Sequence, residues 1–188
     1  MPFQLTRNHY STDWICMMKL LMKLFLTLLI PGIAATYFSL VNAREYQEDE
    51  LPYVEIREVL DLAALGREAK DKKKVIMLEM SASYCGYCRT LEEEIIKPML
   101  RSGDYNQHVL IRKMEIDSHY NLNMQNGEKS SPAQLAQKYN VYVTPTLLFL
   151  DGNGKEISER ILGVNSLDYY GYYVDEALKQ GQLNLKKN

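Results

Sequence analysis

Two cysteines spaced for thiol–disulfide chemistry stand out in this chain of 188 residues. They lie in the run Cys85-Gly86-Tyr87-Cys88, and the third cysteine, Cys16, lies close to the N-terminus ahead of an apolar run. In a C-x-x-C pair the first thiolate attacks a disulfide, and the second thiol resolves the mixed disulfide that results. We therefore expect Cys85 to be the nucleophile and Cys88 the resolving thiol.

Metal binding and a structural crosslink are the competing interpretations of this pair. A zinc site needs two more ligands, and beyond the N-terminal segment the chain offers only His108 and His119, without a paired spacing. A disulfide that closes so short a loop constrains little chain entropy. The pattern favours redox chemistry with no metal and no cofactor other than the Cys85–Cys88 disulfide. A redox-inactive metallochaperone that holds copper or zinc on the two thiols is the alternative from a different class.

Residues 1–43 have the order of regions typical of a secretory signal peptide. The features are a basic region at Lys19 and Lys23, an apolar run over 24–30, and a cleavage-site pattern at Val41-Asn42-Ala43 before polar sequence. The polar leader places the expected start near Met17 or Met18. We expect cleavage and export to the periplasm; the alternative is an uncleaved anchor that leaves the domain facing the periplasm.

Cleavage would leave 145 residues, of which 19 are basic and 23 acidic, for a net charge of −4. This length suits one domain with its own core. We expect a polar lead-in over 44–53 and the domain over 54–183. No basic stripe indicates nucleic-acid binding, and no second apolar span indicates an integral membrane protein. We expect a monomer.

Hydrophobic periodicity and turn residues predict an α/β fold in which helices flank a mixed central sheet. The expected elements are a helix over 54–69, a strand over 75–78, a helix over 90–100, a strand over 109–116, a polar loop over 118–130, a helix over 133–139 capped by Ser131, a strand over 146–150 joined through the turn 151–154 to a strand over 156–161, and a helix over 167–178. This order puts Cys85 at a helix N-terminus, where unpaired amides stabilise a thiolate.

Glu79 interrupts the apolar run that precedes the cysteines and lies six residues before Cys85. Alternation along the strand would point it inward, beneath the helix that carries Cys88. A carboxyl group buried there has a raised pKa and can accept the proton of the resolving thiol. The alternative is that a twist or bulge turns Glu79 to solvent. The acidic run 92–94 is most simply the negatively charged start of a helix, although charge there can also tune the thiols.

The segments 75–88 and 141–146 and the Asp-Gly-Asn-Gly turn together resemble the thioredoxin fold over about residues 55–180. The resemblance implies that Pro145 is a cis-proline facing the cysteine pair and that Thr144 offers backbone hydrogen bonds to a bound substrate chain. It adds Gly86, Tyr87 and Tyr84 to the substrate-binding residues. It also implies an acid at Glu79 and, at Lys113, a lysine that pairs with this acid.

Two features depart from cytosolic thioredoxin: Tyr84 replaces the usual tryptophan, and Gly-Tyr replaces Gly-Pro between the cysteines. The acidic run, the loop 118–130 and the helix that follows resemble SoxW-type exported thioredoxins. Cys-Gly-Tyr-Cys with Thr144 also resembles isomerases of the DsbC kind, but the lead-in 44–53 is too short for their dimerisation domain. We expect a reductase of client-protein disulfides that receives electrons from a membrane donor of the DsbD kind. An isomerase or oxidase is the alternative.

Overall fold

The computed structural model describes residues 17–24 and 51–187. Residues 17–24 form a short helix, and the rest of the predicted signal peptide lies outside the described residues, as does most of the lead-in. Contacts divide the chain into Met1–Leu51 and Pro52–Asn188, and the second unit contains the fold. Within the parts of the chain that the structure describes, no helix is long and apolar enough to cross a membrane.

A mixed sheet lies at the centre of residues 52–187. It contains four strands in the order β2-β1-β5-β6, with bounds Val109–Glu115, Val75–Ser81, Thr146–Leu150 and Ile161–Leu162. β1 pairs in parallel with β2 and antiparallel with β5, which in turn pairs antiparallel with β6. Every residue of β1 is buried, as its apolar sequence requires of a strand covered on both faces.

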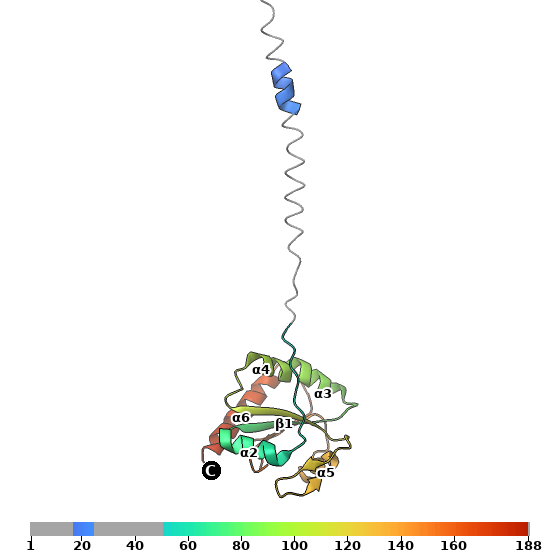
Figure 1. The fold of residues 1–188 in the computed structure, drawn as a ribbon, viewed down its shortest axis with the longest axis vertical. Coiled ribbons are helices and arrows are strands. Elements are labelled where there is room, and N and C mark those ends of the chain that lie inside the picture. Colours follow the sequence, from blue (N-terminus) through green and yellow to red (C-terminus); the bar gives the residue numbers. More distant parts are fainter. Residues whose placement is uncertain (1–16, 25–50, 188) are drawn as a thin grey trace, which may run out of the picture. The chain divides into compact units, whose positions relative to one another are not determined.

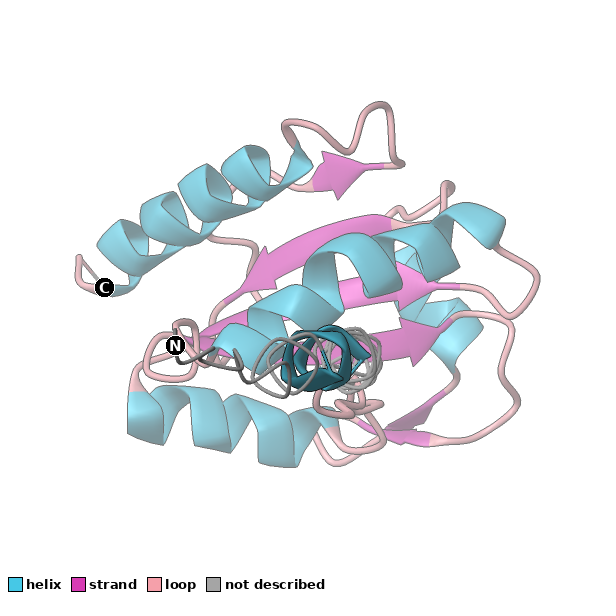
Figure 2. Ribbon diagram, turned by 90° about the horizontal axis from the view of Figure 1, so that it is seen from above, coloured by secondary structure: helices cyan, strands magenta, loops and turns pink. Residues whose placement is uncertain are grey.

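Helices cover both faces of this sheet (Figures 1 and 2). One face is covered by the helical stretch α3 (Gly86–Leu91), η1 (Glu92–Ile96) and α4 (Lys97–Ser102) and by α6 (Tyr170–Leu185). The other is covered by α2 (Leu62–Lys72) and α5 (Pro132–Lys138). The predicted α/β architecture with a mixed sheet is therefore confirmed.

Side chains of β1 alternate between the two faces. Val75 and Met77 belong to the core beneath α3, α4 and α6, whereas Ile76 and Leu78 belong to the core beneath α2 and α5. Because strand side chains repeat with a period of two residues, Glu79 shares the face of Val75 and Met77. It therefore points toward the layer that carries the cysteines.

The helix after the cysteines changes its hydrogen bonding at η1, which is a π-helical turn. The Lys97 N–H donates to the Glu92 carbonyl, five residues back, instead of four. Pro98 follows directly; it has no N–H to donate and its ring clashes with the carbonyl four residues earlier. The π turn accommodates this proline inside one continuous helical stretch.

The predicted helix over 54–69 is wrong in its first half. α2 begins only at Leu62, because the Asp61 side chain accepts a 2.6 Å hydrogen bond from the Ala64 N–H and caps the helix. The preceding residues run beside the edge of the sheet, where Glu58 forms a parallel bridge to Lys113. Ile56 and Val59 of this segment are buried but Leu60 is exposed, so the apolar spacing predicted part of the core but not the helix.

Other predicted elements differ in extent. The polar loop 118–130 contains a two-stranded ribbon, β3 (Leu122–Asn123) and β4 (Lys129–Ser130). The strand predicted over 156–161 reduces to a single bridge at Glu156 and the short β6. α6 begins at Tyr170 and extends to Leu185, later at both ends than predicted. The cap at Ser131 is confirmed as a capping box with Gln134.

Gly66 lets α2 approach the turn after β5 closely. A Cβ atom at Gly66 would lie 2.5 Å from the Gly152 carbonyl oxygen and 2.7 Å from Gln125 Nε2. Gln125 Nε2 also donates to the Gly152 carbonyl at 2.9 Å. Gly66 is therefore a close-packing position, although in the sequence it is a weak helix former.

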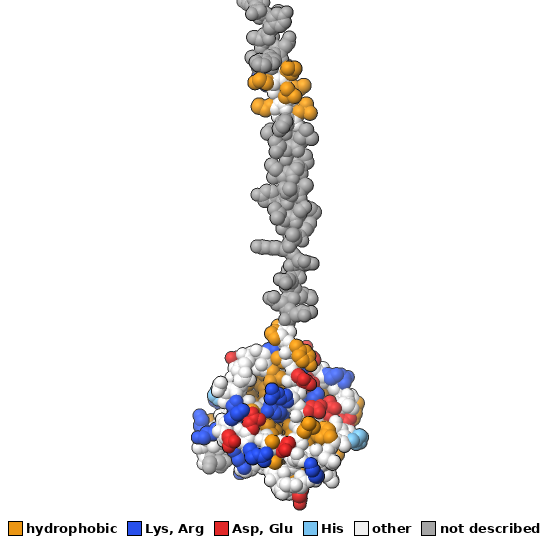
Figure 3. All heavy atoms as spheres, in the orientation of Figure 1, with side chains coloured by type: hydrophobic (Ala, Val, Ile, Leu, Met, Phe, Trp, Pro, Cys, Tyr) orange, Lys and Arg blue, Asp and Glu red, His pale blue; other side chains and the backbone are white. Residues whose placement is uncertain are grey.

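On the visible face of the domain, acidic and basic side chains are interspersed, without a large patch of either sign (Figure 3).

Candidate active site

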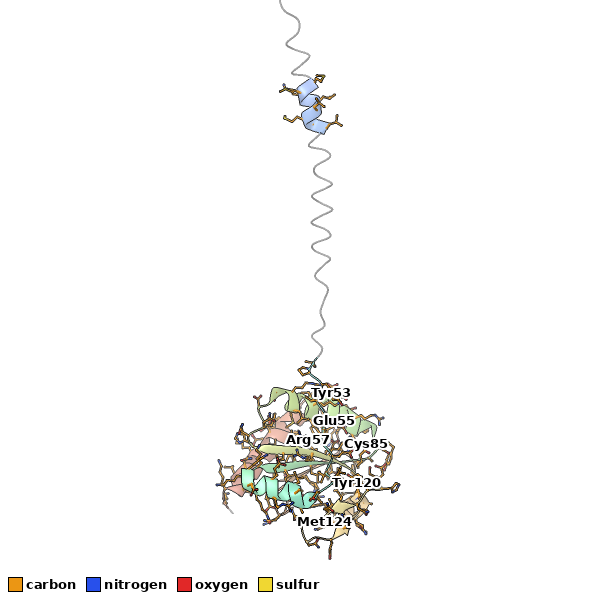
Figure 4. All side chains as sticks on the ribbon, in the orientation of Figure 1. Tyr53, Glu55, Arg57, Cys85, Tyr120 and Met124 are labelled. Atoms are coloured by element: carbon orange, nitrogen blue, oxygen red, sulfur yellow. A yellow bond between two sulfur atoms is a disulfide. The ribbon has the colours of Figure 1, made fainter. Side chains whose placement is uncertain are left out.

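Cys85 and Cys88 form a disulfide at the beginning of α3, with their Cα atoms 5.3 Å apart. Cys85 is the N-cap of α3, and its Sγ accepts a 3.1 Å hydrogen bond from the Cys88 N–H. Figure 4 places Cys85 at the end of the sheet where β1 stops. In this oxidised form Cys85 is 8% and Cys88 1% exposed, so Cys85 is the more accessible of the two cysteines. The amide that binds Sγ would also stabilise a Cys85 thiolate.

The loop between β1 and Cys85 is fixed by hydrogen bonds from two directions. The Cys85 N–H donates to the Ala82 carbonyl at 3.0 Å. The Ser83 N–H and hydroxyl donate to the Asp117 carboxylate at 3.0 and 2.5 Å. These bonds from Ser83 hold the pKa of Asp117 below its ordinary value, since they favour the charged form. Asp117, just beyond β2, thus anchors the cysteine loop.

The Thr144–Pro145 peptide bond is cis and lies at the start of β5. Because Thr146 pairs with Met80 in the antiparallel register, Pro145 lies next to the end of β1. The cysteine loop departs from this same end. The Pro145 carbonyl accepts a 2.8 Å hydrogen bond from the Gly163 N–H, which ties the proline to the residue after β6. The structure therefore brings Thr144 and Pro145 to the edge that carries Cys85.

Large side chains beside the disulfide are open to solvent. Tyr84 is 76% and Tyr87 67% exposed, and Gly86 between them is exposed as well. Val143, two residues before Pro145, and Leu162, the register partner of Thr146, are also exposed. Apolar surface of this kind around a concealed disulfide is suited to contact with a polypeptide.

Glu79 is completely buried, and neither of its carboxyl oxygens has a hydrogen-bond partner within the described residues. Burial, reinforced by the negative charge of Glu92, raises the pKa of Glu79 to about 8, while the positive charge of Lys113 acts in the opposite direction. The alternative in which Glu79 faces solvent is wrong. A neutral carboxylic acid is available on this face at neutral pH.

Lys113 is the register partner of Glu79 on β2, but its ion pairs go to other carboxylates. Its Nζ lies 3.3 Å from Glu92 Oε1 and 3.4 Å from Glu115 Oε1. Desolvation lowers the pKa of Lys113, but these two carboxylates outweigh it and leave the pKa above its ordinary value. The predicted adjacency of Lys113 to Glu79 is thus present, but the predicted pairing is replaced by pairing to Glu92 and Glu115.

The sequence did not identify the contacts of two residues near the site, although it indicated that charge in the run 92–94 can tune the thiols. Glu92 lies four residues after Cys88, which on a helix is the same side, and this spacing was a usable signal. Asp117 is the second residue after β2, where a polar side chain can reach the loop that follows the neighbouring parallel strand, but no local pattern identified Ser83 as its partner. Within residues 17–24 and 51–187 no group of three His, Cys, Asp or Glu side chains could hold a metal ion.

A C-x-x-C disulfide at a helix N-terminus, with a buried acid on the same face, is typical of the active site of a thiol:disulfide oxidoreductase. The family model described as Thioredoxin-like domain matches residues 63–177. The chain belongs to this family and is a thiol:disulfide oxidoreductase whose substrates are protein thiols or disulfides. A search of curated proteins found no match.

Solved thioredoxin structures are similar to this chain at low sequence identity. Thioredoxin from Fasciola hepatica is 20% identical, with 67% of this chain and 99% of that chain covered and a TM-score of 0.46. Reduced thioredoxin pre-protein from Schistosoma mansoni is 21% identical, with 68% and 98% covered and a TM-score of 0.45.

Proposed function

We propose that this protein is a periplasmic reductase of protein disulfides, related to SoxW-type exported thioredoxins. The proposal rests on the disulfide at the start of α3, which is flanked on one edge by Thr144 and Pro145. Cys85 attacks the client disulfide and Cys88 resolves the mixed disulfide, so the client leaves as a dithiol and Cys85–Cys88 forms. The signal-peptide pattern of residues 1–43 supports export.

Client contact falls on the exposed residues that border the disulfide. The backbone of Thr144 hydrogen-bonds an extended client segment, Pro145 shapes the edge, and Gly86 allows close approach. Tyr84 and Tyr87 supply apolar contact area. Electrons come from a membrane donor of the DsbD kind, and the protein acts as a monomer.

Glu79 serves as the proton relay for Cys88. It takes the proton of the Cys88 thiol when this thiol becomes a nucleophile, and it returns a proton when Cys88 is the leaving group. Lys113 modulates this relay through the electrostatic field at Glu79. Burial of Glu79 on the face of the cysteine helix supports the assignment.

The direction of electron flow is tested by the reduction potential of the Cys85–Cys88 couple. A reduction potential of about −270 mV supports a reductase, whereas a potential of about −120 mV would identify an oxidase. Catalytic reduction of insulin, compared between wild type and Cys85→Ser, tests enzyme against metallochaperone; full activity of the variant would refute the proposal. Fractionation of cells that express the full chain tests the periplasmic location.

A further inference from the structure

An unusual set of charged groups lies between α3 and the sheet. Among the described residues, three carboxyl groups, those of Glu79, Glu92 and Glu115, lie around the ammonium group of Lys113, and only Glu92 and Glu115 form ion pairs with it. Glu92 is only 15% exposed in its side chain, and Glu79 is not exposed at all. If every group were ionised, this poorly solvated set would carry a net charge of −2.

We propose that Glu92 is a positioning residue that holds Lys113 away from Glu79, so that Glu79 keeps its proton on the sheet face that packs against the cysteine helix. The inference rests on the proposed relay role of Glu79 and extends it. A residue on the cysteine helix itself controls whether the Glu79 carboxyl group is protonated.

Glu92 connects the two layers of the site. Its N–H donates to the Cys88 carbonyl, so the two residues are one helical turn apart on one side of the helix. Its carboxylate reaches across to Lys113 on β2, 3.3 Å away. Lys113 is directly beside Glu79 in the β1–β2 register. Glu92 therefore competes with Glu79 for the cation that would otherwise favour ionised Glu79.

Among the charged groups packed around Glu79, the carboxylates of Glu92 and Glu115 raise its pKa and the ammonium group of Lys113 lowers it. From β2, Glu115 also engages Lys113, at 3.4 Å. From α6, buried Tyr170 faces Glu79, and its hydroxyl donates to the Gly163 carbonyl at 3.2 Å. From β5, the register partner is the apolar Leu147. Because ionising several neighbouring carboxyl groups costs free energy, the proton stays on the most buried of them, Glu79.

A protonated Glu79 is suited to the oxidised state that the structure holds. When the thiolate of a reducing dithiol attacks Cys85 Sγ, the Cys85–Cys88 bond breaks and Cys88 leaves with the electron pair. Glu79 gives its proton to Cys88 Sγ, which leaves a neutral thiol and a carboxylate. A disulfide between the donor and Cys85 forms in this step, and the second thiol of the dithiol then attacks it and releases Cys85. Oxidation of the donor dithiol to a disulfide supplies both electrons. The proton returns to Glu79 when Cys88 later attacks a mixed disulfide.

The test is a pH titration of the Glu79 carboxyl group by carbon-13 NMR on the oxidised protein labelled at glutamate. We expect Glu92→Gln to lower the midpoint of Glu79 by about one pH unit or more, because Lys113 becomes free to pair with it. The matched control is Glu93→Gln, which removes the same charge one position along the helix from a side chain that is 57% exposed and paired with Lys97. The control should leave the midpoint unchanged.

A second comparison separates control of Lys113 from a simple effect of charge. Lys113→Gln should raise the Glu79 midpoint more in the Glu92→Gln background than in the wild type, because only there does Lys113 pair with Glu79. Equal shifts in both backgrounds, an unchanged midpoint in Glu92→Gln, or a wild-type midpoint near 4.5 would overturn the inference. The titration uses no substrate, so it can fail while Glu79→Gln still slows turnover, and the relay can fail while the titration succeeds.

Discussion

Glu79 and Lys113 stand side by side on β1 and β2, yet no ion pair joins them in the described part of the chain. The Lys113 ammonium lies instead within 3.4 Å of two other carboxylates, those of Glu92 and Glu115. The buried acid is consequently left without a counter-ion or a hydrogen bond. This arrangement favours a proton, not a charge, next to the cysteine helix.

The two cysteines should fail in different ways when each is replaced. We expect Cys85→Ser to abolish insulin reduction, because no nucleophile remains. Cys88→Ser should also lose turnover but accumulate a mixed disulfide between Cys85 and the client, because nothing resolves it. Mass spectrometry of the trapped adduct checks this order. An adduct in Cys85→Ser at the level seen in Cys88→Ser would reverse the roles.

The raised pKa of Glu79 predicts a dependence of stability on pH. Between pH 4.5 and about 8 the unfolded chain releases this proton while the folded chain keeps it, so the free energy of unfolding falls as the pH rises. The loss should be about 4 kcal/mol and should disappear in Glu79→Gln, which cannot ionise.

Urea unfolding of the oxidised protein at pH 4.5, 6.5 and 8.5 measures this loss. The variant should gain stability relative to the wild type as the pH rises and differ least at pH 4.5. Glu93→Gln, at an exposed position, is the control and should follow the wild-type profile. Parallel profiles for wild type and Glu79→Gln would contradict the buried, protonated state of Glu79.

Tyr84 and Tyr87 should contribute to client binding more than to chemistry. Their rings are exposed, so replacement with alanine removes contact area without opening the core. We expect each variant to raise KM for a protein disulfide by about tenfold with little change in kcat. Tyr53→Ala, also at an exposed tyrosine, serves as control. A fall in kcat at unchanged KM would assign the rings to catalysis instead.

Asp117 should act through the position of the cysteine loop. Asp117→Asn weakens the hydrogen bonds from Ser83, and we expect a few-fold lower rate of disulfide exchange with faster amide hydrogen exchange at Ser83 and Cys85. Asp104→Asn, in an exposed loop, changes the charge equally and should affect neither measurement. Slower catalysis without faster amide exchange would show that Asp117 acts by its charge.

Gly66 should resist substitution although it lies within a helix. Alanine is the better helix former, but its Cβ would clash with the Gly152 carbonyl. We expect Gly66→Ala to lower the free energy of unfolding by about 1–3 kcal/mol. Gly171→Ala, where a Cβ meets nothing within 4 Å, is the matched control and should be neutral or stabilising. Denaturant unfolding of both variants decides the matter.

The core strands could be predicted from sequence because burial on both faces imposes a continuous apolar run. β1 and β5 are such runs, and the single charged residue within β1, Glu79, was informative because it breaks the pattern. The first half of the helix predicted over 54–69 was wrong because apolar spacing alone does not distinguish a helix from an extended segment that is buried at intervals. The sequence signal for the true start of the helix was Asp61, because aspartate is a favoured N-cap residue and apolar residues follow it directly.

The partners of charged side chains could not be read from the chain. Lys113 has acidic neighbours on its own strand, on β1 and on the cysteine helix, and only the packing of these elements selects Glu92 and Glu115. The link between Ser83 and Asp117 likewise depends on the parallel pairing of β1 with β2. Such contacts depend on distances between elements, which a local pattern does not contain.

The antiparallel pairing of β1 with β5 has a consequence for the order in which this protein gains its properties. Cys85 and Cys88 are made early, but Pro145 lies 60 residues after Cys85 and reaches the disulfide only when β5 docks beside β1. Contacts between residues so far apart in sequence close late and slowly in folding. An incomplete chain would carry the dithiol without the edge that selects clients. The dithiol is therefore reactive before the chain can select its clients, and closure of the central sheet adds this selectivity.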